Sequence, residues 1–213
     1  MNEKKNLAMS VKSKAEMVRE MNAVHEQVRF INTRKGIKDH EAELLYQAAK
    51  LSRGLIVEIG SYMGRSTAYL ALGTRAGYGQ PIVSIDPWRA PVELQLFATF
   101  QRNIARLGVN GTVTPLRMPS AEAYRLKQPS EAWTCGIELL FIDGDHQEAG
   151  VTLDLRWIER VNVGGVVAFH DYGNGDWPDV TTVVDRYRAE HPDILQLHEL
   201  KGHLIVFRKV AVI

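Results

Sequence analysis

Acidic residues and histidines concentrate in two short segments of this sequence. The first contains Asp143, Asp145 and His146, and the second contains His170 and Asp171. Carboxylates and imidazoles bind divalent metal ions, and histidine also serves as a general base because its pKa lies near neutrality. The two segments therefore point to metal-assisted or acid–base chemistry, of which hydrolysis by a metal-activated water is one form.

A glycine-containing segment, Gly60-Ser61-Tyr62-Met63-Gly64-Arg65-Ser66, follows a short apolar run. Glycines let the backbone turn tightly and approach a ligand closely. The spacing is neither that of the G-x-G-x-x-G dinucleotide fingerprint nor that of a G-x-x-x-x-G-K-[ST] phosphate loop. The sequence therefore argues against a nicotinamide or flavin dinucleotide and against ATP or GTP hydrolysis.

Asp86 and Trp88 follow a second apolar run. A carboxylate at the end of a strand can accept hydrogen bonds from both hydroxyls of a ribose, or it can cap the turn that Pro87 forces. The Trp88 ring is suited to stacking on an adenine or to packing in the core. A metal-dependent hydrolase explains neither Asp86 nor the glycine segment.

Strands and helices are predicted to alternate along most of the chain. Apolar runs predict strands, stretches of helical periodicity predict the helices between them, and the Lys201-Gly202 turn predicts a closing hairpin. This order indicates an α/β fold: a Rossmann-like, mostly parallel seven-stranded sheet with a C-terminal antiparallel hairpin and helices on both faces. The predicted strands are 55–59, 81–86, 113–116, 137–142 and 165–169, the helices are 65–72 (ending at Gly73), 93–107, 148–161 and 179–191, and the hairpin joins 194–200 to 204–207.

Two further helices are predicted before this alternation begins. Apolar residues at helical spacing predict one over 15–32, preceded by a polar, frayed stretch, and Asp39 is the expected N-cap of a second over 39–51. The simplest division is an N-terminal helical segment, 1–40, and a main domain, 41–213. The first helix packs on the main domain, covers the site as a lid, or contacts a second subunit of a homodimer.

Composition narrows the class of protein. The 213 residues carry 26 Lys+Arg against 25 Asp+Glu, a balance that argues against a nucleic-acid surface. Cys135 is the single cysteine, so neither an internal disulfide nor a cysteine-based metal site is expected, which fits a reducing cytoplasm. No stretch approaches the roughly 18–20 apolar residues of a membrane span, and we expect no membrane association.

Across residues 55–208 the chain resembles the class I S-adenosylmethionine-dependent methyltransferases. More narrowly, it resembles the metal-dependent branch that methylates hydroxyls of sugars and antibiotics. The resemblance implies S-adenosyl-L-methionine as cofactor, and this cofactor has no phosphate that a third glycine would need to bind. The motifs that carry it are Val57-Glu58-Ile59-Gly60-Ser61-Tyr62-Met63-Gly64-Arg65-Ser66, Ile85-Asp86, Phe141-Ile142-Asp143-Gly144-Asp145-His146, Gly164-Gly165 and Phe169-His170-Asp171-Tyr172.

The resemblance also implies roles for individual residues around the cofactor. The segment beginning at Gly60 would cradle the methionine part, Glu58 would orient that segment or the cofactor's amino group, and Asp86 would hold the ribose. Ser120 and Ala121 lie where the family contacts adenine. The cofactor contacts implied are Glu58, Gly60, Ser61, Gly64, Ser66, Asp86, Trp88, Ser120, Ala121 and Asp143.

The family's metal ligands correspond to Asp143, His170 and Asp171. Ligands at the ends of two neighbouring strands can converge on one ion, and the two carboxylates suit Mg²⁺. His170 departs from the family, where an oxygen ligand is usual; it either shifts the preference toward a metal such as Mn²⁺ or does not bind metal. His146 corresponds to the histidine that would deprotonate the acceptor hydroxyl, with helix capping as the structural alternative.

The expected function is therefore methyl transfer from S-adenosylmethionine to a hydroxyl of a small molecule, a glycoside or secondary metabolite, with His146 and Asp143 as catalytic residues and metal assistance left open. The alternatives are a metal-independent N- or C-methyltransferase, a metal-dependent hydrolase, and a non-catalytic binding module with a methyltransferase-like fold.

Overall fold

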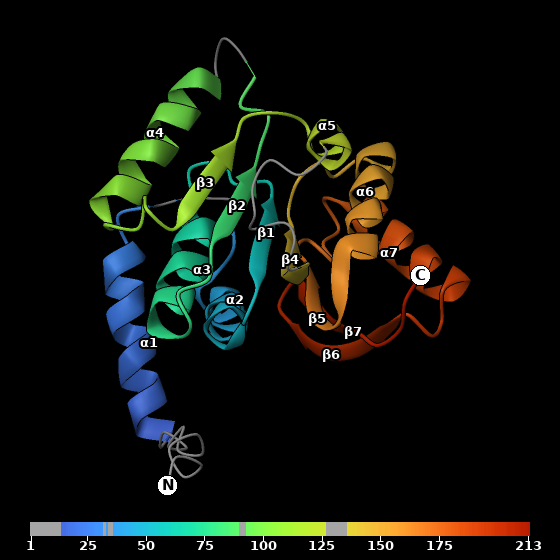
Figure 1. Cartoon of the computed structure of the whole chain (residues 1–213), viewed down its shortest axis with the longest axis horizontal. Helices are drawn as coiled ribbons and strands as arrows, with labels where there is room; N and C mark the ends of the chain where they lie inside the picture. The colour runs from blue at the N-terminus through green and yellow to red at the C-terminus, as the bar shows by residue number, and fades with distance from the viewer. Residues whose placement is uncertain (1–13, 32, 34–35, 90–92, 127–135) are drawn as a thin grey trace, which may run out of the picture.

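A single seven-stranded sheet organises the chain (Figure 1). The computed structural model describes residues 14–31, 33, 36–89, 93–126 and 136–213, so the predictions for residues 1–13 and for Cys135 lie outside the described residues. The strand order is β3-β2-β1-β4-β5-β7-β6. Neighbours from β3 to β5 are parallel, and β7 pairs antiparallel with both β5 and β6. The predicted fold class is confirmed.

The sheet reverses its winding between β1 and β4. Because β1 pairs with β2 on one side and with β4 on the other, the carboxyl ends of these strands meet at a topological switch point. That edge is where open α/β sheets bind ligands. The strands are β1 (Leu55–Ile59), β2 (Ile82–Ile85), β3 (Val113–Leu116), β4 (Ile137–Ile142), β5 (Val161–Phe169), β6 (Leu195–Lys201) and β7 (Leu204–Lys209).

Helices cover both faces of the sheet. Figure 1 places α1 to α4 on one side of the strands and α5 to α7 toward the other, with the N-terminal half of α1 extending away from the body. The helices are α1 (Lys14–Val28), α2 (Asp39–Leu51), α3 (Arg65–Ala76), α4 (Glu93–Arg106), α5 (Ser120–Arg125), α6 (Glu148–Asp154), the 3₁₀ helix η2 (Leu155–Arg160) and α7 (Pro178–Glu190).

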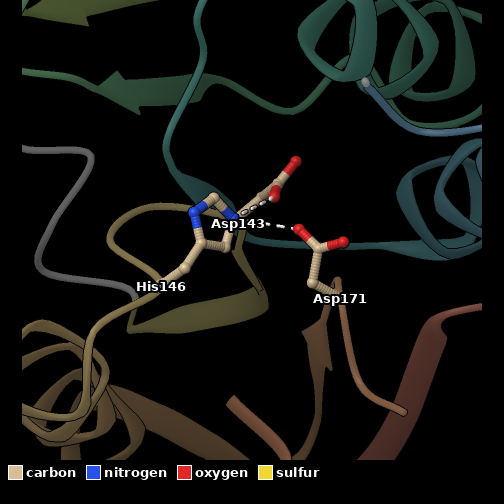
Figure 2. A group of neighbouring side chains, drawn as sticks. All are labelled: Asp143, His146 and Asp171. Carbon is tan, nitrogen blue, oxygen red and sulfur yellow. Dashed lines mark ion pairs between the residues drawn. The ribbon is translucent and has the colours of Figure 1, made fainter. Parts of the chain in front are cut away.

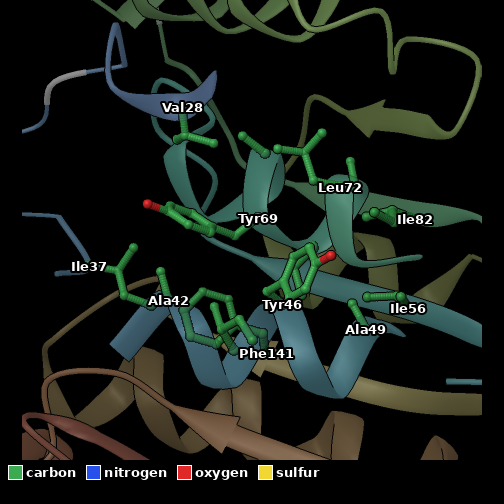
Figure 3. Close-up of a cluster of buried hydrophobic side chains, with 14 of the residues drawn as sticks. Val28, Ile37, Ala42, Tyr46, Ala49, Ile56, Tyr69, Leu72, Ile82 and Phe141 are labelled. Atoms are coloured by element: carbon green, nitrogen blue, oxygen red, sulfur yellow. The ribbon is translucent and has the colours of Figure 1, made fainter. Parts of the chain in front are cut away.

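Alternate residues of each buried strand enter two different hydrophobic cores. In β1, Ile56 joins the core beneath α1 to α4, whereas Val57 joins the core beneath α5 to α7. The same alternation separates Phe141 from Leu140 in β4. Side chains of a strand point to opposite faces in turn, so continuous apolar strands supply both cores at once. Figure 3 shows the first core, where Tyr46 of α2 and Tyr69 of α3 pack over the sheet.

Three helix boundaries differ from the predictions. Helix α3 runs past Gly73 to Ala76. A Cβ at Gly73 would lie 2.4 Å from the Tyr46 carbonyl oxygen, so this glycine permits close packing of α2 on α3 and does not end the helix. Helix α1 ends at Val28, and Lys38 takes the N-cap position of α2 that was expected for Asp39.

The other differences lie in the second half of the chain. The predicted helix 148–161 divides into α6 and η2, and the short helix α5 was not predicted. Strand β5 begins at Val161, four residues earlier than predicted, because the chain pairs with β4 through a register shift around Gly164 and Gly165. Among the described residues, no helix is both long and apolar enough to cross a lipid bilayer.

Candidate active site

Glu58 fixes the glycine segment through hydrogen bonds to its side chains. The side chain is fully buried, and its carboxylate accepts hydrogen bonds from the hydroxyls of Ser61 (3.0 Å) and Ser66 (2.5 Å). Thr67 and Ser84 donate two more, at 2.5 and 2.8 Å. Burial raises the pKa of Glu58, and the four hydroxyls oppose that shift. Of the two roles expected for Glu58, the structure displays orientation of the loop.

Asp86 holds the same loop from the side. Its Oδ2 accepts hydrogen bonds from the backbone N–H groups of Ser61 (3.0 Å) and Tyr62 (2.9 Å), and its Oδ1 accepts one from Trp88 (2.9 Å). Tyr62 has a φ of 45°, a left-handed conformation that is uncommon outside glycine. The loop that follows β1 and the end of β2 therefore form one hydrogen-bonded unit.

Trp88 lies in the core. The residue is 1% exposed, and its ring packs 4.8 Å from that of Phe97 and 4.9 Å from that of Phe100, centroid to centroid. Its Nε1 donates a hydrogen bond to the Tyr62 carbonyl oxygen. The structure thus displays the packing alternative for Trp88, and the ring is covered by α4 where adenine stacking would need it open.

Ser120 and Ala121 begin α5, beyond the end of β3. The Ser120 hydroxyl donates a hydrogen bond to Asp154, a buried carboxylate of α6. Burial raises the pKa of Asp154 to about 6, with a contribution from the negative charge of Asp145. The structure thus buries a carboxylate beside Ser120, in the region implied to contact adenine.

Asp143, His146 and Asp171 meet at the carboxyl ends of β4 and β5 (Figure 2). The Nε2 atom of His146 lies 2.9 Å from Oδ2 of Asp171 and 3.8 Å from Oδ1 of Asp143. The three ligand-type atoms all lie within 4.8 Å of one another. The two segments that concentrate acids and histidines in the sequence therefore form one cluster.

The charged groups of this cluster shift one another's pKa values. The carboxylates of Asp143 and Asp171 outweigh the effect of burial and raise the pKa of His146 to about 9. The ion pairs with His146 and His170 hold the pKa of Asp171 far below its usual range against the opposing effect of burial. Asp171 has a φ of 59°, and its Oδ1 accepts a hydrogen bond from Asn174 at 2.7 Å. Backbone strain of this kind is concentrated at functional sites.

His170 lies under the cluster and is 5% exposed at its side chain. Its Nδ1 is 3.3 Å from Oδ1 of Asp143, and its Nε2 is 3.2 Å from Oε2 of Glu41. The surrounding carboxylates raise the pKa of His170 to about 12 against the opposing effect of burial. Both ring nitrogens thus face carboxylates of the protein, and the cluster of mutually close ligand atoms contains His146 in the place expected for His170.

Glu41 is the residue of this region that sequence reasoning missed. It belongs to α2, far from the motifs in the sequence, and no spacing pattern links it to them. Its position three residues after the N-cap Lys38 signals only a helix start, a role it does fill by accepting the Lys38 backbone N–H at 2.8 Å.

Aromatic rings border the cluster. The ring of Trp177 stacks on that of His146, with centroids 4.5 Å apart and planes at 21°. On the loop after β1, the backbone of Tyr62 is hydrogen-bonded to the side chains of Asp86 and Trp88, and half of the surface of Tyr62 is exposed. Fold and site together define an α/β enzyme with a ligand loop after β1, an acidic residue after β2 and an acid–histidine cluster after β4 and β5.

Comparisons with known proteins identify the class. The profile of a methyltransferase domain family matches residues 57–172, just over half of the chain. An uncharacterized protein of Acanthamoeba polyphaga mimivirus is 42% identical over 137 residues, which are 63% of this chain and 59% of that protein. The chain thus spans about three fifths of the length of this curated relative.

Solved O-methyltransferases share the fold. The structure of the O-methyltransferase NovP superposes with a TM-score of 0.71 at 15% identity, covering 92% of this chain and all of that one. TomG from Streptomyces achromogenes, solved with S-adenosylmethionine, gives a TM-score of 0.65 at 18% identity over 95% of this chain and 93% of its own. The chain belongs to the methyltransferase domain family.

Proposed function

We propose that this protein is a class I S-adenosylmethionine-dependent methyltransferase that methylates a hydroxyl group of a small molecule, a glycoside or a secondary metabolite. In this proposal His146 accepts the hydroxyl proton. The observation that carries the proposal is the contact of His146 with Asp143 and Asp171 beside the loop that begins at Gly60. Methylation of oxygen needs a group that removes the hydroxyl proton, and the neutral imidazole of His146, the form that prevails above its pKa of about 9, is suited to this.

The chemical step is an in-line displacement. The acceptor oxygen forms a bond to the methyl carbon while the bond from that carbon to the sulfonium sulfur breaks, and the sulfur keeps the electron pair. The hydroxyl proton moves to Nδ1 of neutral His146, whose Nε2–H faces the carboxylates of Asp171 and Asp143. The protein contributes mainly by holding the two reactants in line, which can lower the barrier by about 7–11 kcal/mol. Glu58 and Asp86 serve this purpose by fixing the loop beside the cofactor.

The donor set is also suited to a divalent cation. Asp143 and Asp171 offer carboxylate oxygens, which Mg²⁺ and Mn²⁺ prefer, and their ligand atoms lie close enough to share an ion. Such an ion would supply Lewis-acid activation that lowers the pKa of the acceptor hydroxyl. We propose Asp143 and Asp171 as its ligands, with His146 kept free to act as the base. His170 is a poorer candidate because both of its ring nitrogens already face carboxylates.

The acceptor class rests on the surroundings of the cluster and on relatives. Trp177 presents aromatic surface beside it, and Tyr62 presents an exposed ring on the loop after β1; such rings are suited to a sugar or an aromatic acceptor. NovP is described as an O-methyltransferase, and TomG as an O-methyltransferase involved in tomaymycin synthesis.

The experiment compares His146→Asn with wild type on 3,4-dihydroxybenzoate and a 4-methylumbelliferyl rhamnoside, with S-adenosylhomocysteine formation as the readout. Loss of a general base predicts a fall in kcat of about 100-fold or more. Binding of S-adenosylhomocysteine by calorimetry should change less than about twofold, since His146 lies outside the loop. His198→Asn, at an exposed position of β6, is the matched control and should keep wild-type turnover.

Measurement of Mn²⁺ binding distinguishes a metal ligand from the general base within the cluster. If His146 is the base, the His146→Asn variant binds Mn²⁺ as wild type does, whereas Asp143→Asn does not. Weaker Mn²⁺ binding in His146→Asn would instead make His146 a ligand. Full turnover in EDTA would favour the metal-independent alternative, and wild-type turnover in His146→Asn would overturn the base assignment.

A further inference from the structure

Glu41 joins the N-terminal helices to the acid–histidine cluster. The residue is 1% exposed, and its Oε2 lies 3.2 Å from Nε2 of His170. His170 in turn places Nδ1 3.3 Å from Oδ1 of Asp143 and 3.4 Å from Oδ2 of Asp171. The imidazole of His170 therefore spans from Glu41 at one edge to the two proposed catalytic carboxylates at the other.

The Glu41 carboxylate is itself held on several sides. Its Oε2 accepts the backbone N–H of Lys38 at 2.8 Å, and its Oε1 accepts the backbone N–H of His203 at 2.7 Å. Lys38 starts α2, and His203 lies in the turn between β6 and β7. A buried carboxylate with this many partners has little freedom, so it is a fixed anchor for the imidazole.

We propose that Glu41 is a positioning residue that sets the orientation of His170 and, through it, the placement of Asp143 and Asp171. The inference rests on the proposed function, because it assigns to these carboxylates the role described above. Rotation of the His170 ring about its χ angles breaks its contacts with Glu41 and Asp143 together. The start of α2 and the β6–β7 turn, both outside the matched residues 57–172, are thus part of the active-site architecture.

Positioning of this kind has a measurable kinetic signature. Displacement of a catalytic group by about 1 Å can cost about 100-fold in rate. Glu41 touches neither the loop at Gly60 nor Asp86, so its loss should lower kcat and leave cofactor affinity alone. A purely structural role would lower stability and leave both kcat and the geometry of the cluster unchanged.

The test compares Glu41→Gln with Glu43→Gln. Both changes remove one carboxylate from α2, but Glu43 pairs with Lys201 and His25 and does not contact His170. The readouts are kcat on the better of the two acceptors above, affinity for S-adenosylhomocysteine, and the imidazole ¹⁵N resonances of His146, which Glu41 does not touch. We expect Glu41→Gln to lower kcat by about 10- to 100-fold, to keep cofactor affinity within about twofold and to shift the His146 resonances.

Glu43→Gln should leave all three readouts at wild-type values. A Glu41→Gln protein with a lower melting temperature but unchanged kcat and His146 resonances would overturn the proposal. If wild type methylates neither acceptor, the proposed function fails on its own; the His146 resonances then still decide the positioning, since an unshifted spectrum contradicts it and a shifted one upholds it.

Discussion

Gly60 and Asp143 lie so close that a Cβ atom on Gly60 would be 1.8 Å from the carbonyl oxygen of Asp143. Gly60 also has a φ of 85°. The first residue of the proposed cofactor loop therefore rests directly on the backbone that carries a carboxylate of the proposed catalytic cluster. This contact couples the two halves of the site: a displacement of the loop displaces Asp143.

Gly60→Ala should damage both stability and cofactor binding. A Cβ at that distance from backbone atoms forces the loop or the end of β4 to move, and the left-handed φ adds strain. We expect a loss of about 3 kcal/mol or more in the free energy of unfolding, measured by urea denaturation, and a loss of S-adenosylhomocysteine binding in calorimetry.

Gly79→Ala is the matched control for this substitution. Gly79 has a φ of 68°, but an added Cβ would meet nothing within 4 Å. It should cost only the left-handed strain, about 1 kcal/mol, and leave cofactor binding intact. Equal losses in the two variants would show that the approach of Gly60 to Asp143 matters little.

Asp86→Asn should weaken cofactor binding and also lower stability, because its NH₂ group would face a backbone N–H that the carboxylate accepts. The amide keeps one oxygen for the backbone N–H groups of Ser61 and Tyr62 but replaces the other acceptor with a donor. The proposed charge-assisted hydrogen bonds from the ribose hydroxyls to Asp86 are worth about 1.5–3 kcal/mol. Their loss predicts that the dissociation constant for S-adenosylhomocysteine rises by about tenfold or more.

Asp145→Asn controls for the removal of a strand-end carboxylate near the site. Asp145 follows β4 and accepts the backbone N–H of Gln147 at 2.9 Å, much as Asp86 accepts that of Trp88. Its substitution should leave cofactor affinity unchanged. A similar loss of affinity in both variants would contradict a specific role for Asp86 at the ribose.

The sequence predicts the sheet well because its signals are local. Buried parallel strands are continuous apolar runs, and the residues after them fall at one edge whatever the packing of the helices. The meeting of Asp143, His146 and Asp171 follows from that edge alone. Periodicity also identifies α2, α4 and α7 to within one residue at each end.

Long-range packing explains what the sequence does not reveal. In the sequence, Gly73 predicts the end of a helix. In the structure it lies within α3 and allows close packing against Tyr46, 27 positions earlier in the chain. For Trp88 the sequence leaves adenine stacking and core packing open, and the structure shows packing against Phe97 and Phe100 of a helix whose docking no local pattern specifies. Glu41 reaches His170 across 129 residues of sequence, so only the folded chain shows their contact.

Asp154→Asn should stabilise the protein at neutral pH and not in acid. Burial raises the pKa of Asp154 from 3.8 to about 6 in the folded state, so the folded form favours the neutral acid. Its contribution to stability is present below the unfolded pKa and is lost as the pH rises through about 6. The asparagine carries no charge and still accepts the hydrogen bond of Ser120.

The stability difference between Asp154→Asn and wild type should therefore depend on pH. We expect it to grow from near zero at pH 4 to about 3 kcal/mol at pH 7 and above, the equivalent of the pKa shift. Urea denaturation from pH 4 to pH 8 measures it. A difference that stays constant over this range would show that Asp154 does not titrate with the raised pKa.

Lys209→Met tests whether a buried ammonium group stabilises the junction between η2 and β5. Lys209 is 2% exposed, and its Nζ donates hydrogen bonds to the carbonyl oxygens of Ile158 (2.9 Å), Glu159 (3.3 Å) and Val161 (2.9 Å). These carbonyls end η2 and begin β5, and that of Ile158 also accepts the backbone N–H of Val161. Methionine keeps most of the stem volume but removes the donor, and a buried acceptor left unsatisfied costs about 1–3 kcal/mol before relaxation.

We expect Lys209→Met to lower the free energy of unfolding by about 2 kcal/mol or more, measured by urea denaturation at pH 7. Lys201→Met, in the same hairpin, is the control: Lys201 pairs with Glu43 at a half-exposed position, and such pairs contribute about 0–1 kcal/mol. Equal effects of the two substitutions would mean that water satisfies the carbonyls when the ammonium is gone. A larger effect at Lys209 would establish that its buried ammonium stabilises the junction of η2 and β5, the strand that His170 and Asp171 follow.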